Sequence, residues 1–190
     1  MGFSGHLVFA RSSRPLRESP VFEGAEEAVG PEERRPGGWR TVQLRQGAWN
    51  VERLPALVDR TGHPACVADV SDSDLALVTG LDTTGRRWQA WLNLDAVARL
   101  LVEEPDDVED QITWLYTPAF HEAVRRKRAE LDKAVPEDAE GALAWARAAG
   151  AHPPAERAPI EKVLRSQEPF AEDLFSTLLD TLGFPGPTTA

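Results

Sequence analysis

The chain has 190 residues, of which 42% are hydrophobic, so it is long and apolar enough to bury a core of its own. Its formal charge of −10 at pH 7 argues against a protein that binds nucleic acid by neutralising phosphates, because such proteins are usually basic. The single cysteine, Cys66, excludes an intramolecular disulfide framework.

The first part of the chain predicts two strands separated by a long polar segment. Gly5–Arg11 (GHLVFAR) is typical of a short buried strand, and Trp39–Arg45 (WRTVQLR) alternates like a half-buried one. Residues 12–38 between them hold four prolines and a mixed-charge run with little periodicity, which predicts a surface loop. A loop of this length is either functional or mobile, and we expect it to be mobile. The apolar pair Val21 and Phe22 should fix it to the core.

The middle of the chain predicts a short helix followed by three strands. Residues 54–60 form the helix, with Pro55 in its first turn and Gly62 directly after its end. The strands are expected at residues 65–70, 75–81 and 87–94. The sequence DTTG at residues 82–85 suits a type I turn with Gly85 in a left-handed bulge position, so the last two strands should form a hairpin.

The position of Gly85 fixes the register of this hairpin and divides its side chains between two faces. One face joins Trp88 to apolar partners and is plain core. The other face mixes apolar and polar side chains, namely Leu77, Arg87, Gln89, Trp91 and Asn93. This blend is typical of a surface that binds a partner or ligand, because tryptophan supplies contact area and the polar groups supply direction. The alternative is that a C-terminal helix covers this face.

The hydrophobic period changes after the hairpin from two residues to about 3.6, which predicts a mostly helical second half. The first expected helix begins at Leu94 and ends at Pro105, and the second runs from Asp106 or Asp107 to Tyr116. The third runs from Pro118 to about Val135, and the fourth from about Pro136 to Gly150. The last helical region spans residues 160–182, with an interruption near Pro169. We therefore expect an α+β fold. Residues 1–94 should form an antiparallel sheet of about five strands, and the helical residues 95–190 should pack on it as one compact unit.

Catalytic and metal-binding patterns are incomplete throughout the sequence, so we assign no catalytic residue, no metal and no cofactor. The carboxylates Asp69, Asp72 and Asp74 lack the glycine and the distal glutamate of a calcium loop, and a turn with local backbone bonds explains them. The four histidines are scattered, and Cys66 lies in a predicted buried strand. No P-loop, G-x-S-x-G or dinucleotide glycine motif occurs, although a triad built from distant residues remains open.

Positive charge is concentrated only in the run RRKR at residues 125–128. On a helix, side chains four residues apart are neighbours, which would pair Glu122 with Arg126, Arg126 with Glu130, and Arg128 with Asp132. The run therefore predicts a solvated, self-paired helix face rather than an anion-binding patch.

The leading functional hypothesis is a non-enzymatic cytoplasmic binding or interaction protein, of immunity or adaptor type, that binds another protein through the sheet face around Trp91. The alternative is a small-molecule enzyme or sensor with a pocket between sheet and helices. We expect no membrane contact, because the sequence has no apolar run of about 18 residues and no signal peptide. Oligomeric state is not predicted. The excess of arginine over lysine, 18 to 3, is typical of a GC-rich bacterium.

Overall fold

The computed structural model describes residues 2–25, 29–103 and 111–186. Within these residues a six-stranded sheet has the order β2-β3-β1-β4-β5-β6, and every neighbouring pair is antiparallel. The strands are β1 (Gly5–Arg11), β2 (Val29–Arg35), β3 (Trp39–Arg45), β4 (Ala65–Ser71), β5 (Leu75–Leu81) and β6 (Arg87–Leu92). The α-helices are α1 (Leu54–Thr61), α2 (Leu94–Leu100), α3 (Gln111–Trp114), α4 (Pro118–Ala148), α5 (Ala158–Arg165) and α6 (Ala171–Thr181). The predicted α+β fold, with its sheet in the N-terminal half, is confirmed.

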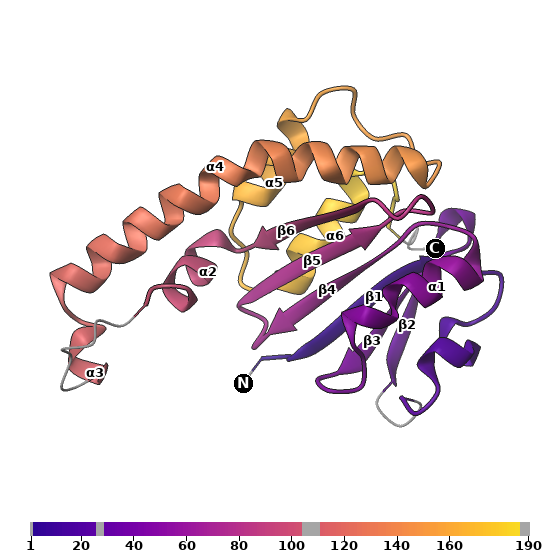
Figure 1. Cartoon of the computed structure of the whole chain (residues 1–190), viewed down its shortest axis with the longest axis horizontal. Helices are drawn as coiled ribbons and strands as arrows, with labels where there is room; N and C mark the ends of the chain where they lie inside the picture. Colours follow the sequence, from indigo (N-terminus) through magenta and orange to yellow (C-terminus); the bar gives the residue numbers. More distant parts are fainter. Residues whose placement is uncertain (1, 26–28, 104–110, 187–190) are drawn as a thin grey trace.

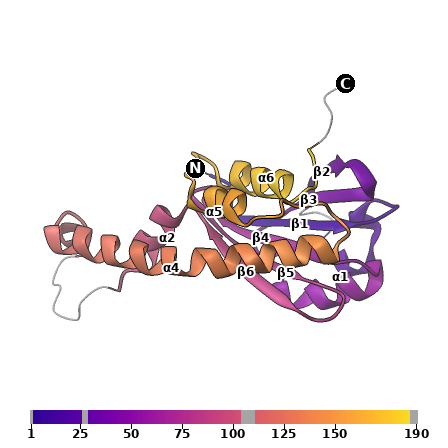
Figure 2. The ribbon, with the colours of Figure 1, turned by 90° about the horizontal axis from the view of Figure 1, so that it is seen from above.

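Helices cover both faces of the sheet (Figures 1 and 2). Helices α4, α5 and α6 close the larger core on one face, and α1 closes a smaller core on the other. Neighbouring residues of one strand enter different cores, as Val8 and Phe9 of β1 do, because successive strand side chains point to opposite faces. Trp145 fixes α4 to the sheet, since its indole N–H lies 3.2 Å from the carbonyl oxygens of both Ala65 and Leu81.

Helix α4 is a single helix of 31 residues, so the expected break at Pro136 is wrong. A proline inside a helix removes one backbone hydrogen bond and bends the helix, at a cost of about 3 kcal/mol. Apolar side chains on both sides of the proline, including Val135 and Ala139, are buried against the core, and this packing keeps the helix continuous. Figure 1 shows α4 changing direction along its length.

The first half of α4 extends beyond the sheet, and α2 lies beside it (Figure 1). We call α2, α3 and residues 115–135 the arm. Helix α2 ends at Leu100 and not near Pro105, and α3 is shorter than the helix expected up to Tyr116. The expected start of that helix, at Asp106 or Asp107, lies outside the described residues. The interruption near Pro169 is confirmed, because it separates α5 from α6.

The range 12–38, expected to be a surface loop, contains a strand at Val29–Arg35. Strand β2 pairs with β3 at the edge of the sheet and makes it six-stranded instead of five-stranded. Two short 3-10 turns before it bury Leu16 and Phe22, so the anchoring role expected of Phe22 is confirmed. The sequence VGPEERR lacks the apolar alternation of a strand. Charged side chains are buried in β2 instead, because Arg35 pairs with Asp180 and Glu32 pairs with Arg40.

The β5–β6 hairpin has the predicted register, with Gly80 opposite Trp88 and Leu77 opposite Trp91. Gly85 adopts the expected left-handed conformation, with φ of 85°. An added Cβ at Gly80 would overlap the Trp88 indole, so the glycine is what allows the ring to lie flat over the strand. Strand β6 ends two residues earlier than expected, because Asn93 has φ of 60° and turns the chain into α2.

Candidate functional site

Four of the five residues predicted to form a binding surface lie together on the β5–β6 hairpin. Arg87 and Gln89 are exposed, and Leu77 and Trp91 are half-buried. Gln89 donates a hydrogen bond of 3.0 Å from Nε2 to Thr79 Oγ1 on the neighbouring strand. Helices α4, α5 and α6 pack mainly on the opposite face, with Trp88, although Trp91 also contacts the edge of that larger core.

Asn93, the fifth predicted residue, lies apart from the other four and is not exposed with them. Its side chain is buried, and Nδ2 donates to the backbone oxygens of Asp74 at 2.6 Å and Glu168 at 3.0 Å. Its Oδ1 accepts a hydrogen bond from the Glu168 N–H at 3.1 Å. Asn93 therefore ties the β4–β5 turn to the connection between α5 and α6.

Sequence reasoning missed a histidine–carboxylate pair beside this surface. Cross-strand pairing places Leu44, His6, Asp69, Leu77 and Trp91 in one row across five strands. His6 Nδ1 lies 2.5 Å from Asp69 Oδ1, and Nε2 of the same ring is buried with no hydrogen-bond partner among the described residues. The two residues are 63 positions apart, so only the β1–β4 pairing, which the sequence does not indicate, could have revealed them.

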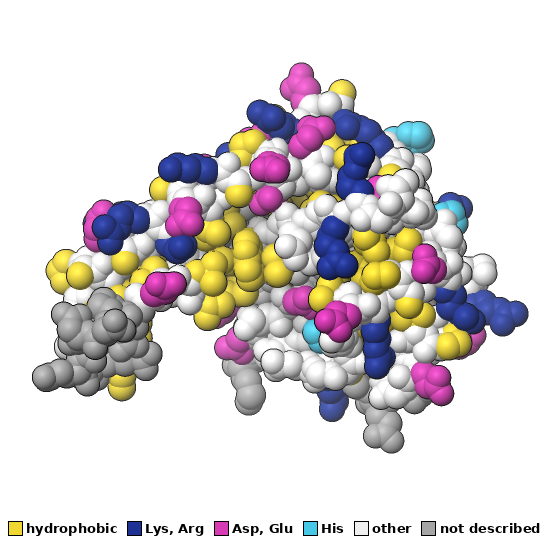
Figure 3. Space-filling view, in the orientation of Figure 1, with side chains coloured by type: hydrophobic (Ala, Val, Ile, Leu, Met, Phe, Trp, Pro, Cys, Tyr) yellow, Lys and Arg dark blue, Asp and Glu magenta, His cyan; other side chains and the backbone are white. Residues whose placement is uncertain are grey.

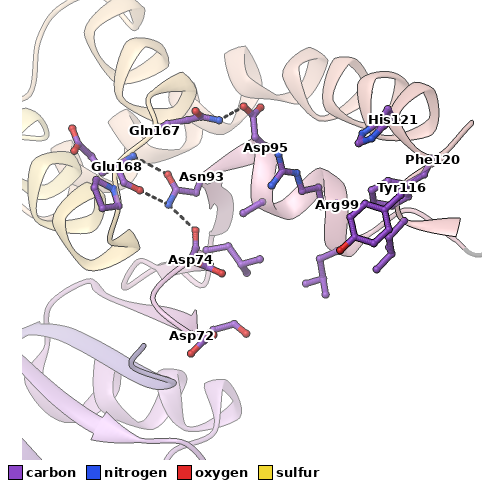
Figure 4. Close-up of a pocket in the computed structure, with 16 residues that line it drawn as sticks. Asp72, Asp74, Asn93, Asp95, Arg99, Tyr116, Phe120, His121, Gln167 and Glu168 are labelled. Carbon is purple, nitrogen blue, oxygen red and sulfur yellow. Dashed lines mark hydrogen bonds between the residues drawn. The ribbon is translucent and has the colours of Figure 1, made fainter. Parts of the chain in front are cut away.

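A cleft of about 910 Å³ separates the arm from the body of the molecule (Figure 4). The β4–β5 turn and the α5–α6 connection form one wall, which carries Asp72, Asp74 and Glu168. Helix α2, the α3–α4 connection and the start of α4 form the other wall, on which Arg99 comes from α2 and Tyr116 from the connection. We call this feature the arm cleft. No local sequence pattern indicates this cleft, because its walls come from separate parts of the chain.

Several large hydrophobic side chains are exposed, and some of them lie in the arm cleft. The exposed ones among the described residues are Leu100, Leu101, Ile112, Leu115, Tyr116 and Phe170. Tyr116 is 79% exposed and Ile112 is 70% exposed. Leu100, Leu115 and Tyr116 line the cleft itself, and Phe170 follows a lining residue, Pro169. Figure 3 shows hydrophobic side chains gathered where α2 and α4 approach each other.

The charged groups of the arm cleft carry an acidic surplus. Asp95 is neutralised by Arg128 at 2.7 Å and also accepts a hydrogen bond from Gln167. Asp72 Oδ1 accepts a hydrogen bond of 2.8 Å from the Gly2 N–H and stays exposed. The carboxylates of Asp74 and Glu168 have no partner among the described residues. Three carboxylates therefore remain on the body wall, against one arginine on the arm wall.

A smaller cleft of about 380 Å³ lies between β6 and α4. Its lining combines Arg87 and Gln89 of the predicted surface with Glu137 and Asp138 of α4. Burial, together with the charge of Glu137, raises the pKa of the Asp138 carboxyl to about 6. The predicted surface thus adjoins a carboxyl that titrates just below neutral pH.

The other candidate groups are structural. Burial raises the pKa of the Cys66 thiol far above its ordinary range despite the nearby Arg35 charge, so this thiol is not a nucleophile. The carboxylates of the predicted turn separate, since Asp69 pairs with His6 whereas Asp72 binds the Gly2 N–H. In the described ranges no three histidine, cysteine or acidic side chains converge as metal ligands would.

The basic run on α4 is paired largely within its own helix, although only one of the three predicted pairs forms. Arg128 contacts Asp132 at 3.2 Å, which is the expected pair. Glu122 pairs with Arg125 and Glu130 pairs with Lys127, three residues apart, instead of both pairing with Arg126. These exposed ion pairs neutralise part of the positive charge of residues 125–128 within the helix itself.

Among the described residues, no helix combines the length and the hydrophobicity that a bilayer crossing needs. Comparisons with protein-family models, with curated proteins and with solved structures found no match for this chain. Its function is therefore inferred from its own geometry.

Proposed function

We propose that this chain is a non-enzymatic binding protein, of immunity or adaptor type, that contacts another protein through the arm cleft. The observation that carries this proposal is that three of the six exposed large hydrophobic side chains of the described residues, Leu100, Leu115 and Tyr116, line one cleft. Exposed apolar area is unfavourable by about 25 cal/mol per Å² relative to burial, and contiguous patches usually mark interaction sites. A partner that buries Tyr116 and Leu100 would recover that free energy.

The polar groups of the arm cleft support a binding role more than a catalytic one. Nucleophilic catalysis needs a hydroxyl or thiol held by a base, and no lining hydroxyl is hydrogen-bonded to His121 within the described ranges. Asn93 is fully used by backbone groups, and Asp95 is paired with Arg128. We also propose a cytoplasmic location, which the buried free thiol of Cys66 supports.

The sheet face around Trp91 remains a proposed second contact surface. Its support is the side-by-side position of Leu77 and Trp91 with the exposed Arg87 and Gln89. The area is apolar at its centre and polar at its margin, which is the usual composition of a small protein interface.

A small-molecule enzyme or sensor is the second candidate function. The volume of the arm cleft, about 910 Å³, lies near the upper end of the range usual for ligand pockets, roughly 300–1,000 Å³. Arg99, His121 and Tyr116 could direct a ligand there. A metabolite that raises the melting temperature of the native chain, but not that of Arg99→Ala, would favour this candidate.

Affinity capture from the native host tests the proposed function. The bait carrying both Leu100→Ser and Tyr116→Ser should lose its specific partner, with binding weakened by roughly tenfold or more, as happens when apolar anchors are removed. Both side chains are exposed, so the fold should be unaffected. Arg147→Ala, an exposed change at the far end of α4, is the matched control. A partner retained by the double variant but lost with Trp91→Ala would place the interface on the sheet face instead.

A further inference from the structure

We propose that the arm cleft receives a basic amphipathic helix of the partner protein. This inference rests on the proposed function and names the chemistry of the partner segment. It follows from the two walls of the cleft, which differ in character (Figure 4).

The arm wall offers apolar contact. Phe120 is buried and makes a T-shaped contact with Trp114, with ring centroids 4.9 Å apart. This contact holds the Phe120 ring in place at the base of the wall. The cleft is also lined by Leu100, Leu115 and Tyr116, whose side chains are largely exposed. A ligand segment must therefore present apolar side chains to this wall to cover them.

The body wall offers negative charge. Asp72, Asp74 and Glu168 stand on this side, across the cleft from Tyr116 and Phe120 (Figure 4). Because Asp95 is already paired with Arg128, these three carboxylates are the negative charges left for a ligand, and they outnumber the single positive charge of Arg99 on the arm wall. Lysine or arginine side chains on the flank of the ligand segment would complement them.

An α-helix is the segment that can satisfy both walls at once. It separates apolar and charged side chains onto adjoining faces, whereas an extended peptide gains its affinity mainly by pairing with an open strand edge. The walls of the arm cleft are helices, a turn and a connection, so they provide no such edge.

The size of the cleft agrees with a helix. One helical turn is about 5.4 Å long and about 10 Å wide, so it occupies roughly 400 Å³. The arm cleft, at about 910 Å³, accommodates about two turns. The recognised stripe would therefore consist of apolar residues spaced i, i+3 or i+4, and i+7, with basic residues on one flank.

Fluorescence anisotropy with designed peptides and the full chain tests the proposal. The probes are a leucine–lysine amphipathic helix of about 18 residues, which is about 27 Å long, its leucine–glutamate counterpart with the same leucine spacing, and a scrambled leucine–lysine peptide. The leucine–lysine helix should bind at least tenfold more tightly than either other peptide. Equal binding of the scrambled peptide would overturn the proposal, because the attraction would then reflect only the overall charge of −10.

Two charge variants locate the binding. Asp72→Asn, Asp74→Asn and Glu168→Gln combined should weaken binding of the leucine–lysine helix by about tenfold. The matched control removes three exposed carboxylates elsewhere, through Glu52→Gln, Asp59→Asn and Glu156→Gln, and should change binding by about twofold or less. Equal effects of the two variants would overturn the assignment to the cleft.

The same variants separate this inference from the proposed function. If Leu100→Ser with Tyr116→Ser abolishes capture of the native partner but the cleft charge variant does not, the cleft binds a protein that is not a basic helix. If the wild-type chain instead forms dimers that the same leucine and tyrosine changes disrupt, the occupant is a second copy. Either result overturns the inference. Capture weakened by both the apolar and the cleft charge variants, in a monomeric protein, supports it.

Discussion

Arg35 shows how a single polar residue can connect distant parts of this chain. Its side chain is 1% exposed and pairs with Asp180 of α6. It also donates hydrogen bonds to the Phe184 backbone oxygen at 2.6 Å and to Ser176 Oγ at 2.7 Å. A buried charge is tolerated only when its partners replace water. Three partners of Arg35 come from α6 and the residues after it, and a fourth, the Glu33 carboxylate of β2 itself, lies 3.3 Å from Arg35 Nε. Arg35 therefore fastens edge strand β2 to the C-terminal part of the fold.

Removing the Arg35 side chain should destabilise the protein strongly. Arg35→Ala leaves a cavity and leaves Asp180 without its cation, so we expect the free energy of unfolding to fall by about 3–5 kcal/mol. Urea denaturation measures this change. The neighbour Arg34 is exposed, and Arg34→Ala should change stability by about 0.5 kcal/mol or less. Similar midpoints for both variants would show that the Arg35 network contributes little.

Asp138 gives the stability a pH dependence of known sign. Burial raises the pKa of its carboxyl to about 6 in the folded protein, above the value of about 3.9 in an unfolded chain. The folded state thus binds this proton more tightly, so the contribution is present at pH below about 4 and is lost as the pH rises through about 6.

Asp138→Asn should therefore raise the melting temperature at pH 7.5, and the gain should shrink at pH 4.5. Asparagine stays neutral and avoids the cost of burying a carboxylate at the higher pH. Thermal unfolding at both pH values checks this, with Glu156→Gln as an exposed control. A gain that is the same at both pH values would contradict the raised pKa.

At the scale of elements, the β5–β6 hairpin has one tryptophan on each of its two faces, Trp88 on one and Trp91 on the other. Trp88 is buried between the sheet and α4, where its ring centroid lies 5.9 Å from that of Trp145. Trp91 is half-buried at the edge of the same core. The two substitutions should therefore differ in their effects on stability and on binding.

Trp88→Ala should lower the free energy of unfolding by about 3–5 kcal/mol, because it leaves a cavity over Gly80. Trp91→Ala should cost about 1 kcal/mol or somewhat more, since only part of the ring is packed. Equilibrium denaturation of both variants measures the difference. Equal losses would mean that the Trp91 face is as closely packed as the core, and it could not then serve as a contact surface.

The elements that could be predicted from the sequence are those fixed by local chemistry. Gly85 sets the hairpin register through a turn of a few residues, and Gly62 ends α1 in the left-handed conformation. Strand β2 could not be predicted, because its burial depends on Arg35 meeting Asp180, 145 positions away. Pro136 indicated a helix end, yet packing on both sides overrode that local preference.

The candidate sites show the same division. The side chains of the Trp91 face follow from the period of two along one hairpin, so four of the five predicted members lie together. Asn93 lies apart from these four because its left-handed φ turns it out of the strand pattern. The arm cleft needs the mutual position of the β4–β5 turn, α2, α4 and the α5–α6 connection, which no local pattern encodes.

At the scale of the whole molecule, the sheet and the helices after it share one core. Phe9, Val78 and Trp88 of the sheet belong to the same buried cluster as Leu143 and Leu174 of the helices. Without the helices, the face of the sheet that carries Phe9, Val78 and Trp88 would be exposed to water, and exposed apolar area costs about 25 cal/mol per Å². Residues 1–94 and residues 95–190 should therefore differ in secondary structure but should not fold independently of each other.

A fragment of residues 1–94 should therefore fail to fold on its own. It would lose the helical cover of Phe9 and Trp88 and the partners of Arg35 on α6, while keeping only the smaller core under α1. We expect its near-ultraviolet circular dichroism to lack the fixed tryptophan signals of the full chain and its thermal transition to be broad. The full chain should unfold in a single cooperative step. Adding residues 95–190 as a separate chain should restore the tryptophan signals if the shared core is what orders the sheet. A fragment that unfolds cooperatively alone would show that the sheet is an independent domain, and that the helices serve mainly to build the arm.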